Sequence, residues 1–403
     1  MAHKRTVEAT RFPERMKVAI VTVRHDPQDD RIYFKEALSL ARRMEVVLIG
    51  PDQGQALTWD PRVSYHSIPR RRGGMGRLWS MVEAVRAVCR VNPDFCHVHD
   101  LELSLALPFL RLFTRAKLIY DSHEVFTRQD ILLRFRERPW IGRPLAWVVE
   151  RAENILVRCC HHIVTAVEPD GLAFRGLRVP VRTIFNYPPL AMFDTAPAAV
   201  EIARQRHPGR LPVVYQGTMS RKRGVFQMLD AVALVKQKEP RIVLKLIGLT
   251  DGDLKTEIEE RIQELSLSDD VEITGWLRHE LIAVEMRASL IGLVPLQPNP
   301  KYDRALPIKL LEYMATGLPV VAARLPLMER YIRESDSGVV CDSSQPEDLA
   351  CAILGLLNEP ERCRRMGENG LRAVREWWNW GRMEVALFEV YEALGAPIVA
   401  VQT

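Results

Sequence analysis

Short runs of apolar and β-branched residues alternate with segments of helical periodicity along most of the chain. The run KVAIVTV at 17–23 is followed by a helical pattern at 30–44 and by a second apolar run, EVVLIG, at 45–50. A strand, a helix and a strand at this spacing form a βαβ unit, and uninterrupted apolar runs are typical of strands buried on both faces. The alternation therefore predicts an α/β fold built on parallel sheets.

The alternation is interrupted once, near the middle of the chain. Residues 186–212 are rich in proline and alanine and poor in strand signals, and a second α/β series starts with VVYQGTM at 213–219. We expect two Rossmann-like domains at 17–190 and 211–380, joined by a linker at 191–210. Ligands of open α/β sheets bind at the carboxyl ends of the strands, and we expect them in the crevice between the two domains.

Composition excludes several classes of protein. The chain has 403 residues, 47% of them hydrophobic, and a formal net charge of +5, which is globular composition with a mild preference for anions. Its seven cysteines include no CxxC pair and no Cys/His cluster at zinc spacing, so a reducing cytoplasm is the simplest interpretation. Residues 1–16 are polar and are expected to form an N-terminal extension, not a signal peptide. No apolar run is long enough to span a membrane.

Two segments mix arginine with large apolar residues. RRRGGMGRLW at 70–79 and LLRFRERPWIGRPLAW at 132–147 have the composition of interfacial segments. They favour a peripheral contact with the inner face of a membrane, and ordinary helices with solvated arginines are the alternative.

Polar side chains follow two strands predicted in the first half of the chain. CHVHD at 96–100 and LIYDSHE at 118–124 place His99, Asp100, His123 and Glu124 at strand ends. A neighbouring carboxylate can orient an imidazole and shift its pKa, which suits His123 for a role in catalysis. The alternative for His99, which alternates with His97, is a histidine satisfied in the core.

The segment VVYQGTMSRKRGV at 213–225 joins a strand to a helix. The strand ends at Gly217, the helix starts near Gly224, and Arg221 to Arg223 lie between them. Backbone N–H groups and the helix dipole in such a loop both favour an anion. The loop is thus a candidate phosphate site, and a solvated basic turn is the alternative.

The stretch LPIKLLEYMATGLPVVAA at 306–323 carries a cation where a helix begins. Pro307 suits the first turn of a helix and Lys309 falls within that turn. The helix dipole disfavours a cation there by about 0.3–1 kcal/mol, a conflict that a docked anion would resolve. Glu312, one turn further, could accept the hydroxyls of a ribose, whereas an exposed Lys–Glu pair is the alternative. No GxGxxG, GxxxxGK[ST] or GxSxG motif follows any predicted strand.

These motifs together resemble the retaining glycosyltransferases that have two Rossmann-like domains (the GT-B fold), close to glycosyltransferase family 4. The similarity spans nearly the whole chain and includes DRIYFKEALSLARR, HVHDLELSLAL, LIYDSHE, YQGTMSRKRG, ITGWL and KLLEYMATGLPVVA, in that order. The resemblance implies that the second domain holds a nucleoside diphosphate sugar, with UDP favoured over GDP. It also implies that the first domain receives the acceptor and that a C-terminal helix, 381–403, crosses back to the first domain.

The resemblance also implies roles for individual residues. Glu312 is similar to a ribose-binding glutamate, Lys309 to a lysine that meets the diphosphate, and His123 to a histidine that faces the transferred sugar. The implied catalytic residues are His123, Arg223 and Lys309. The implied donor-binding residues are Gly217, Thr218, Arg223, Gly275, Trp276, Leu277, Arg304, Leu306, Pro307, Ile308, Lys309 and Glu312. On the acceptor side the implied residues are Asp29, Arg31, His99, Asp100 and Glu124.

The sequence departs from the family pattern at two places. Arg304 stands where the family has its first glutamate, and RHDPQDDRI at 24–32 replaces a glycine-rich loop. The implied activity is sugar transfer to an acceptor hydroxyl with retention of configuration. Neither a metal nor another cofactor is expected, since Asp29–Asp30 and Asp251–Asp253 look like turns. The acceptor could be a lipid-linked glycan, a polysaccharide end or a small natural product, but not a nucleic acid. A nucleotide-sugar epimerase or hydrolase, and a catalytically silent subunit that binds a sugar nucleotide or a glycan, are the alternatives.

Overall fold

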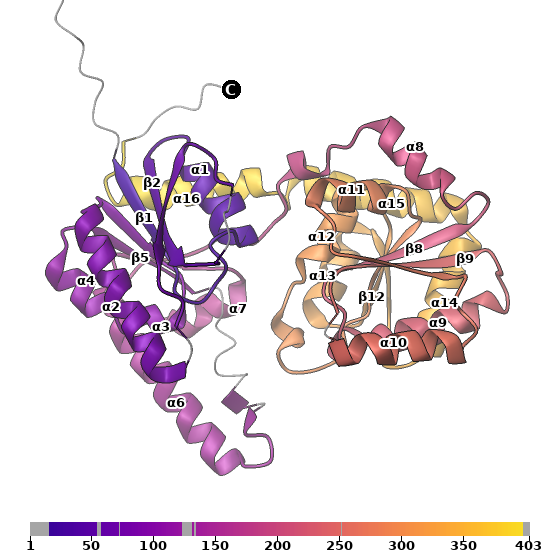
Figure 1. Ribbon diagram of the computed structural model, residues 1–403, viewed down its shortest axis with the longest axis horizontal. Coiled ribbons are helices and arrows are strands. Elements are labelled where there is room, and N and C mark those ends of the chain that lie inside the picture. The colour runs from indigo at the N-terminus through magenta and orange to yellow at the C-terminus, as the bar shows by residue number, and fades with distance from the viewer. Residues whose placement is uncertain are drawn as a thin grey trace, which may run out of the picture. The chain divides into compact units, whose positions relative to one another are not determined.

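The computed structural model describes residues 16–54, 58–71, 73–122, 131–132, 134–250 and 252–397. These residues form two compact units, one made of the residues up to Phe185 and from Glu384 onward, the other of Asn186–Met383 (Figure 1). The division falls at 185/186, not at 190. The expected linker at 191–210 contains a helix, α8 (Pro197–Gln205), that packs against α11 (His279–Arg287) inside the second unit.

The first unit is built on a seven-stranded parallel sheet with strand order β3-β2-β1-β4-β5-β6-β7. The strands are β1 (Lys17–Val21), β2 (Glu45–Pro51), β3 (Val63–Ile68), β4 (Phe95–Val98), β5 (Lys117–Ser122), β6 (His162–Thr165) and β7 (Val181–Thr183). The edge strand β3 was not predicted, because its sequence VSYHSI alternates polar and apolar residues and lacks the continuous apolar run of the central strands.

The helices of the first unit differ in length from those predicted. The segment after β1, where the pattern at 30–44 indicated a helix, begins as a π-helix, η1, and the long helix α6 contains Pro144. The main helical segments are η1 (Asp30–Ala37), α1 (Leu38–Leu40), α2 (Gly73–Val91), α3 (Leu101–Ser104), α4 (Leu107–Phe113), α6 (Pro139–Leu156) and α7 (Glu168–Gly171). Short 3-10 turns are η2 (Val157–Cys159) and η3 (Leu172–Phe174).

The second unit repeats this plan with a six-stranded parallel sheet of order β10-β9-β8-β11-β12-β13. Its strands are β8 (Leu211–Gln216), β9 (Ile242–Ile247), β10 (Val271–Gly275), β11 (Ile291–Val294), β12 (Val320–Ala323) and β13 (Gly338–Cys341). Besides α8 and α11, its helices are α9 (Val225–Lys236), α10 (Gly252–Glu264), α12 (Ile308–Ala315), α13 (Pro326–Ser335), α14 (Pro346–Leu357) and α15 (Pro360–Glu376). The 3-10 turns are η4 (Leu190–Phe193), η5 (Arg221–Arg223) and η6 (Tyr302–Arg304). The last helix, α16 (Trp380–Ala393), starts in the second unit, and its residues from Glu384 cluster with the first.

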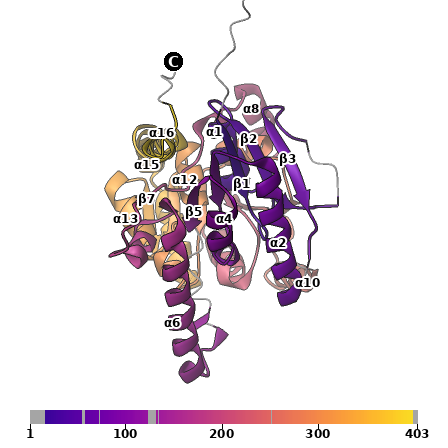
Figure 2. The same ribbon diagram turned by 90° about the vertical axis from the view of Figure 1, so that its left-hand side faces the viewer.

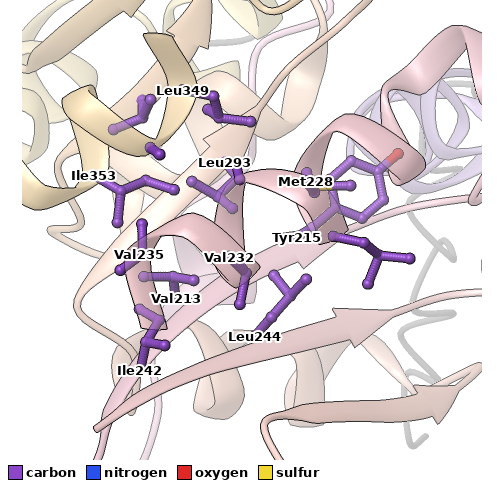
Figure 3. Close-up of a cluster of buried hydrophobic side chains, with 14 of the residues drawn as sticks. Val213, Tyr215, Met228, Val232, Val235, Ile242, Leu244, Leu293, Leu349 and Ile353 are labelled. Atoms are coloured by element: carbon purple, nitrogen blue, oxygen red, sulfur yellow. The ribbon is translucent and has the colours of Figure 1, made fainter. Parts of the chain in front are cut away.

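The core of the second unit shows why these residues form these elements. Val232 and Val235 of α9 pack between the sheet, represented by Val213 and Leu244, and Ile353 of α14 (Figure 3). Branched aliphatic side chains on both strands and helices make up most of this layer. Packing of this kind makes the sheet a rigid platform for the loops at its carboxyl edge.

Both sheets have the doubly wound order in which the chain reverses direction between two central strands. The reversal lies between β1 and β4 in the first unit and between β8 and β11 in the second. Loops at such a switch point splay apart at the carboxyl edge, which makes it the preferred ligand site of this architecture. No helix in the described part of the chain is long and apolar enough to cross a bilayer.

Candidate active site

Three glycines line the carboxyl edge of the second sheet. Gly217, Gly248 and Gly275 lie at the ends of β8, β9 and β10 with φ of +121°, +143° and +70°. The Gly217 N–H donates to the Ile247 carbonyl (2.8 Å), and the Gly248 N–H donates to the Gly275 carbonyl (2.9 Å). A Cβ atom on Gly248 would overlap the Gly217 carbonyl oxygen, so this close approach requires glycine. Because these three residues have no side chains, their backbone beside the switch point is accessible to a ligand.

Two cations converge on Gly217. A Cβ atom added there would lie 2.8 Å from Lys309 Nζ and 3.4 Å from Arg223 Nη1. Lys309 comes from the first turn of α12 and Arg223 from η5, the loop after β8. Arg223 Nη1 donates to the Thr218 carbonyl at 3.3 Å, which holds the guanidinium along this loop.

Lys309 is buried, and no hydrogen-bond partner for its ammonium lies within the described parts of the chain. Its side chain lies over the ring of Tyr215, with Nζ 3.9 Å from the ring centroid, and the residue is 8% exposed. Its ammonium nitrogen finds no acceptor among the described residues. Burial lowers the pKa of Lys309 well below its ordinary value, the charge of Arg223 lowers it further, and Glu312 raises it. A buried cation in this state is suited to an anionic ligand, which would supply the missing acceptor.

The loop that carries Arg223 is fixed to the neighbouring strand. Gly224, in the left-handed region with φ of +78°, leaves no room for a Cβ atom against the Pro295 carbonyl after β11. The Gln297 N–H donates to the Lys222 carbonyl (2.9 Å). Helices α9 and α12 both begin without a side-chain cap. The Val225 and Leu310 N–H groups donate to the Ser220 and Pro307 carbonyls, and the remaining first-turn N–H groups could donate to a ligand.

Two tyrosines, neither of which carries a sequence signal, support the site. Tyr313 Oη accepts a hydrogen bond from the Gln216 N–H (2.7 Å), and its ring packs directly on Gly292, where a Cβ atom would lie too close. Tyr215 Oη donates to the Thr218 carbonyl (3.0 Å). Burial raises the pKa of Tyr215 to about 12 and that of Tyr313 well above its ordinary value, so both remain hydrogen-bond donors. These contacts tie α12 to the end of β8.

The other residues expected to bind the donor lie in η6, at the start of α12 and at the end of β10. Glu312 is half-buried one turn beyond Lys309, and Pro307 is the N-cap of α12, preceded by Leu306 and followed by Ile308. Arg304 is half-buried in η6. Gly275 ends β10, where Trp276 is 65% exposed and Leu277 half-buried. Since β10 lies two strands from β8, these residues lie roughly 10 Å from Gly217.

The acceptor-side residues within the described part of the chain are mostly buried in the first unit. Arg31 donates to Asp121 Oδ2 (2.7 and 3.1 Å) and to the Ile184 carbonyl (2.8 Å), and its Nε lies 3.0 Å from Glu36 Oε1. Its guanidinium therefore joins η1 to the ends of β5 and β7. Arg31 was expected on the acceptor side, and the structure places it in the core of the first unit with its guanidinium paired to Asp121 and Glu36.

The carboxylates of Asp29 and Asp100 accept hydrogen bonds from backbone N–H groups. Asp29 caps η1 by accepting from the N–H groups of Arg31 and Ile32. Asp100 Oδ2 accepts from the Thr22 hydroxyl (2.9 Å) and from the N–H groups of Val23 and Arg24, at the switch point of the first sheet. Buried Asp100 therefore fixes the conformation of the loop after β1, where the family pattern would have a glycine-rich loop.

Histidines form a buried polar cluster nearby. His97 and His99 stack at 4.7 Å between ring centroids, and His99 Nε2 lies 3.3 Å from Glu36 Oε2. The full burial of His99 agrees with the alternative that it is a histidine of the core. Burial, followed by the charge of Asp121, raises the pKa of Glu36 well above its ordinary value, against the lowering effect of Arg31. His123 and Glu124 lie outside the described residues.

The same cluster offers a set of possible metal ligands that the sequence did not reveal. Among the residues that the structure describes, Glu36, His97 and His99 bring ligand atoms within 4.8 Å of one another. The guanidinium of Arg31 beside Glu36 opposes a cation there, because like charges in a buried site repel strongly. All seven cysteines are free thiols.

The sequence of the second unit matches a known family. Residues 201–373 match the family model described as Glycosyl transferases group 1. The D-inositol 3-phosphate glycosyltransferase of Pseudarthrobacter chlorophenolicus is 25% identical over 331 residues, covering 79% of this chain and 76% of that relative. The alpha-D-kanosaminyltransferase of Streptomyces kanamyceticus is 30% identical over 157 residues, 39% of each chain.

Solved structures extend the likeness to both units. Sucrose-phosphate synthase from Thermosynechococcus elongatus superposes with a TM-score of 0.76 at 21% identity, covering 94% of this chain and 99% of that one. Anabaena HepE in complex with UDP-glucose superposes with a TM-score of 0.70 at 14% identity, covering 94% and 100%. The two units therefore form the same fold as these proteins.

Proposed function

We propose that this chain, which belongs to the group 1 glycosyltransferases and has their GT-B fold, transfers a sugar from a nucleoside diphosphate sugar to an acceptor hydroxyl with retention of configuration. The observation that carries the proposal is the buried ammonium of Lys309, which has no hydrogen-bond acceptor among the residues that the structure describes and lies beside Arg223 and the open backbone of Gly217. A diphosphate would accept hydrogen bonds from both cations and from the uncapped first turns of α9 and α12. Glu312 would then bind the ribose, with the base towards Gly275–Leu277.

The two cations would act mainly on the leaving group. As the bond between the sugar C1 and the diphosphate oxygen breaks, negative charge grows on the diphosphate, and Lys309 and Arg223 stabilise that charge in a site poor in water. We propose that the acceptor oxygen attacks C1 on the face from which the diphosphate leaves, which retains the configuration. The proton of the acceptor hydroxyl passes to the departing phosphate oxygen, so no enzyme nucleophile and no metal takes part.

We propose a UDP-sugar as the donor and a hydroxyl-bearing acceptor from one of three classes. HepE binds UDP and UDP-glucose, which supports a UDP-sugar donor over a GDP-sugar donor for this chain. For the acceptor we keep a lipid-linked glycan, a polysaccharide end and a small natural product. Contact with a membrane is a separate proposal that rests on residues of the first unit.

Calorimetry with UDP and GDP tests the donor site. Lys309→Ala and Glu312→Ala should each weaken binding about tenfold or more, because a charge-assisted hydrogen bond contributes roughly 1.5–3 kcal/mol. Lys255→Ala is the matched control, since Lys255 is an exposed lysine on α10 of the same unit. Unchanged affinity in both site variants would refute the assignment.

Product analysis separates the proposed transfer from its rivals. An epimerase or a hydrolase converts the donor without an acceptor, whereas a transferase makes glycosylated product only when an acceptor is added. A silent subunit binds the nucleotide but turns over nothing, so slow donor hydrolysis by the wild type that disappears in Lys309→Ala would exclude it.

A further inference from the structure

Three helices of the first unit expose large apolar side chains to solvent. They are α2, α4 and α6, and α2 contacts α3 and α4 while α3 contacts α6. Figures 1 and 2 show these helices together on one side of the unit, with one end of α6 projecting beyond it. The exposed apolar residues on the helices are Met75, Leu78, Trp79, Val82, Phe109, Leu112, Phe113, Trp140, Leu145, Trp147, Val148 and Ile155. We call this set the α2–α4–α6 face.

Helix α6 carries its bulkiest apolar residues on the side that faces away from the protein. At 100° per residue, Trp140, Trp147, Val148 and Ile155 fall within one stripe about 100° wide. The buried residues Gly142 and Ala146 lie on the opposite side of the helix. A surface helix ordinarily has polar residues on its outer side, so this pattern is inverted.

Helix α6 is nevertheless anchored to the core. Glu153, on its inner side, accepts a hydrogen bond from Tyr120 Oη of β5 (2.8 Å). Burial raises the pKa of Glu153 from its ordinary value. The apolar stripe is therefore presented outward by a helix whose orientation is fixed from within.

Helix α2 repeats the inversion. Met75, Leu78, Trp79 and Val82 follow the spacing i, i+3, i+4, i+7, and all four are exposed. The buried residues of α2, such as Ala84, lie on the other side of the helix. The two longest helices of this side of the unit thus share the same outward apolar pattern.

Helix α4 shows the pattern on a shorter scale. Phe109, Leu112 and Phe113 are exposed at i, i+3 and i+4, and Leu112 is 75% exposed, while Leu107 and Leu110 are buried. Three separate helices expose apolar stripes, which is more than the scattered single residues of an ordinary protein surface.

The charges around these stripes are predominantly positive. The three helices carry six arginines (Arg77, Arg86, Arg90, Arg111, Arg143 and Arg151) and three glutamates (Glu83, Glu150 and Glu153). One of the glutamates, Glu153, is turned into the core. Arg151 lies over the ring of Trp147, 6.0 Å from its centroid, so cation and aromatic ring share one surface.

We propose that the α2–α4–α6 face docks on the surface of an anionic lipid bilayer. Outward tryptophan, phenylalanine and leucine would enter the boundary between headgroups and acyl chains, and the arginines would meet the lipid phosphates. The excess of arginine over glutamate on these helices complements the negative charge of the lipid. The outward apolar stripes supply the side chains that would enter the bilayer. The proposal goes beyond glycosyl transfer and does not depend on it.

Co-sedimentation of the full chain with lipid vesicles tests the proposal. Vesicles of phosphatidylcholine mixed with phosphatidylglycerol should bind the protein at low salt, and vesicles of phosphatidylcholine alone should bind it much more weakly. Trp140→Ala should lower the partition coefficient about tenfold, as expected for a lost apolar anchor. Arg143→Gln should lower it about fivefold, the effect of one cation near an anionic surface.

Matched controls use similar residues far from this face in the sequence. Trp377 is 54% exposed in the second unit, against 74% for Trp140, and Arg333 is an exposed arginine on α13. Trp377→Ala and Arg333→Gln should leave vesicle binding unchanged. Calorimetric binding of UDP should be the same in all four variants, which separates this test from that of the donor site.

Three results would overturn the proposal. The first is equal binding, or none, to anionic and neutral vesicles. The second is a loss in Trp377→Ala as large as that in Trp140→Ala. The third is a dimer in sedimentation velocity that Trp140→Ala abolishes, because a second copy of the chain would then cover the face.

Discussion

Lys309 has a positive charge that the free protein stabilises poorly. Its ammonium is buried, lacks a hydrogen-bond acceptor among the described residues and lies close to Arg223. Replacing it by methionine should therefore raise the free energy of unfolding of the ligand-free protein by about 1 kcal/mol or more, or roughly 2–4 °C in Tm, while abolishing tight nucleotide binding. Thermal unfolding with and without UDP measures both effects.

The difference in free energy of unfolding between the wild type and the Lys309→Met variant should depend on pH. The pKa of Lys309 is lowered in the folded state, so between that lowered value and the ordinary 10.5 the unfolded chain binds more protons than the folded one. The cost of Lys309 is then greatest below its lowered folded-state pKa and disappears as the pH rises towards 10.5. A Lys309→Met variant that is less stable than the wild type at neutral pH would contradict this account.

Arg304 is one of the two places at which this sequence departs from the family pattern. Arginine offers five donors and no acceptor, so it cannot accept hydrogen bonds from sugar hydroxyls as a glutamate does. A planar carboxylate, as in a uronic acid donor, would suit it, and an ordinary hexose could bind through the backbone of Leu306 to Ile308. We predict that Arg304→Glu changes the ranking of donor sugars in a transfer assay, while the Kd for UDP stays within about twofold. An unchanged ranking would make Arg304 a simple loop residue.

At the scale of elements, the proposed donor site depends on how closely β8 and β9 approach each other at their carboxyl ends. A Cβ atom on Gly248 would overlap the Gly217 carbonyl oxygen, and φ at Gly248 is +143°. We expect Gly248→Ala to lower the free energy of unfolding by about 1–3 kcal/mol and to weaken UDP binding, because Gly217 must move. Gly355→Ala is the control, since Gly355 lies within α14 with open space around it and should stabilise by about 0.5–1 kcal/mol. Equal stability of the two variants, measured by urea unfolding, would show that the approach tolerates a side chain.

At the scale of the whole molecule, the two units repeat one fold but differ in what they offer a ligand. The second unit presents the cations Lys309 and Arg223, whereas the possible metal ligands Glu36, His97 and His99 are buried in the first. If the cations alone neutralise the leaving diphosphate, sugar transfer should persist in excess EDTA. Metal analysis of the treated enzyme is the control, and complete loss that Mg²⁺ or Mn²⁺ restores would show that a metal is required.

The sequence by itself determined the features that local patterns encode. Uninterrupted apolar runs specified the central parallel strands of both sheets. The conflict between Lys309 and the helix start it occupies indicated a candidate anion site at the start of α12, because periodicity and dipole effects act within a few residues. Only the tertiary structure decided the features that join distant residues. Arg31 pairs with Asp121 across 90 positions, and Gln216 bonds to Tyr313 across 97. Pairings at that separation leave no periodic signal, which is why the burial of Arg31, His99 and Asp100 could not be predicted from their spacing.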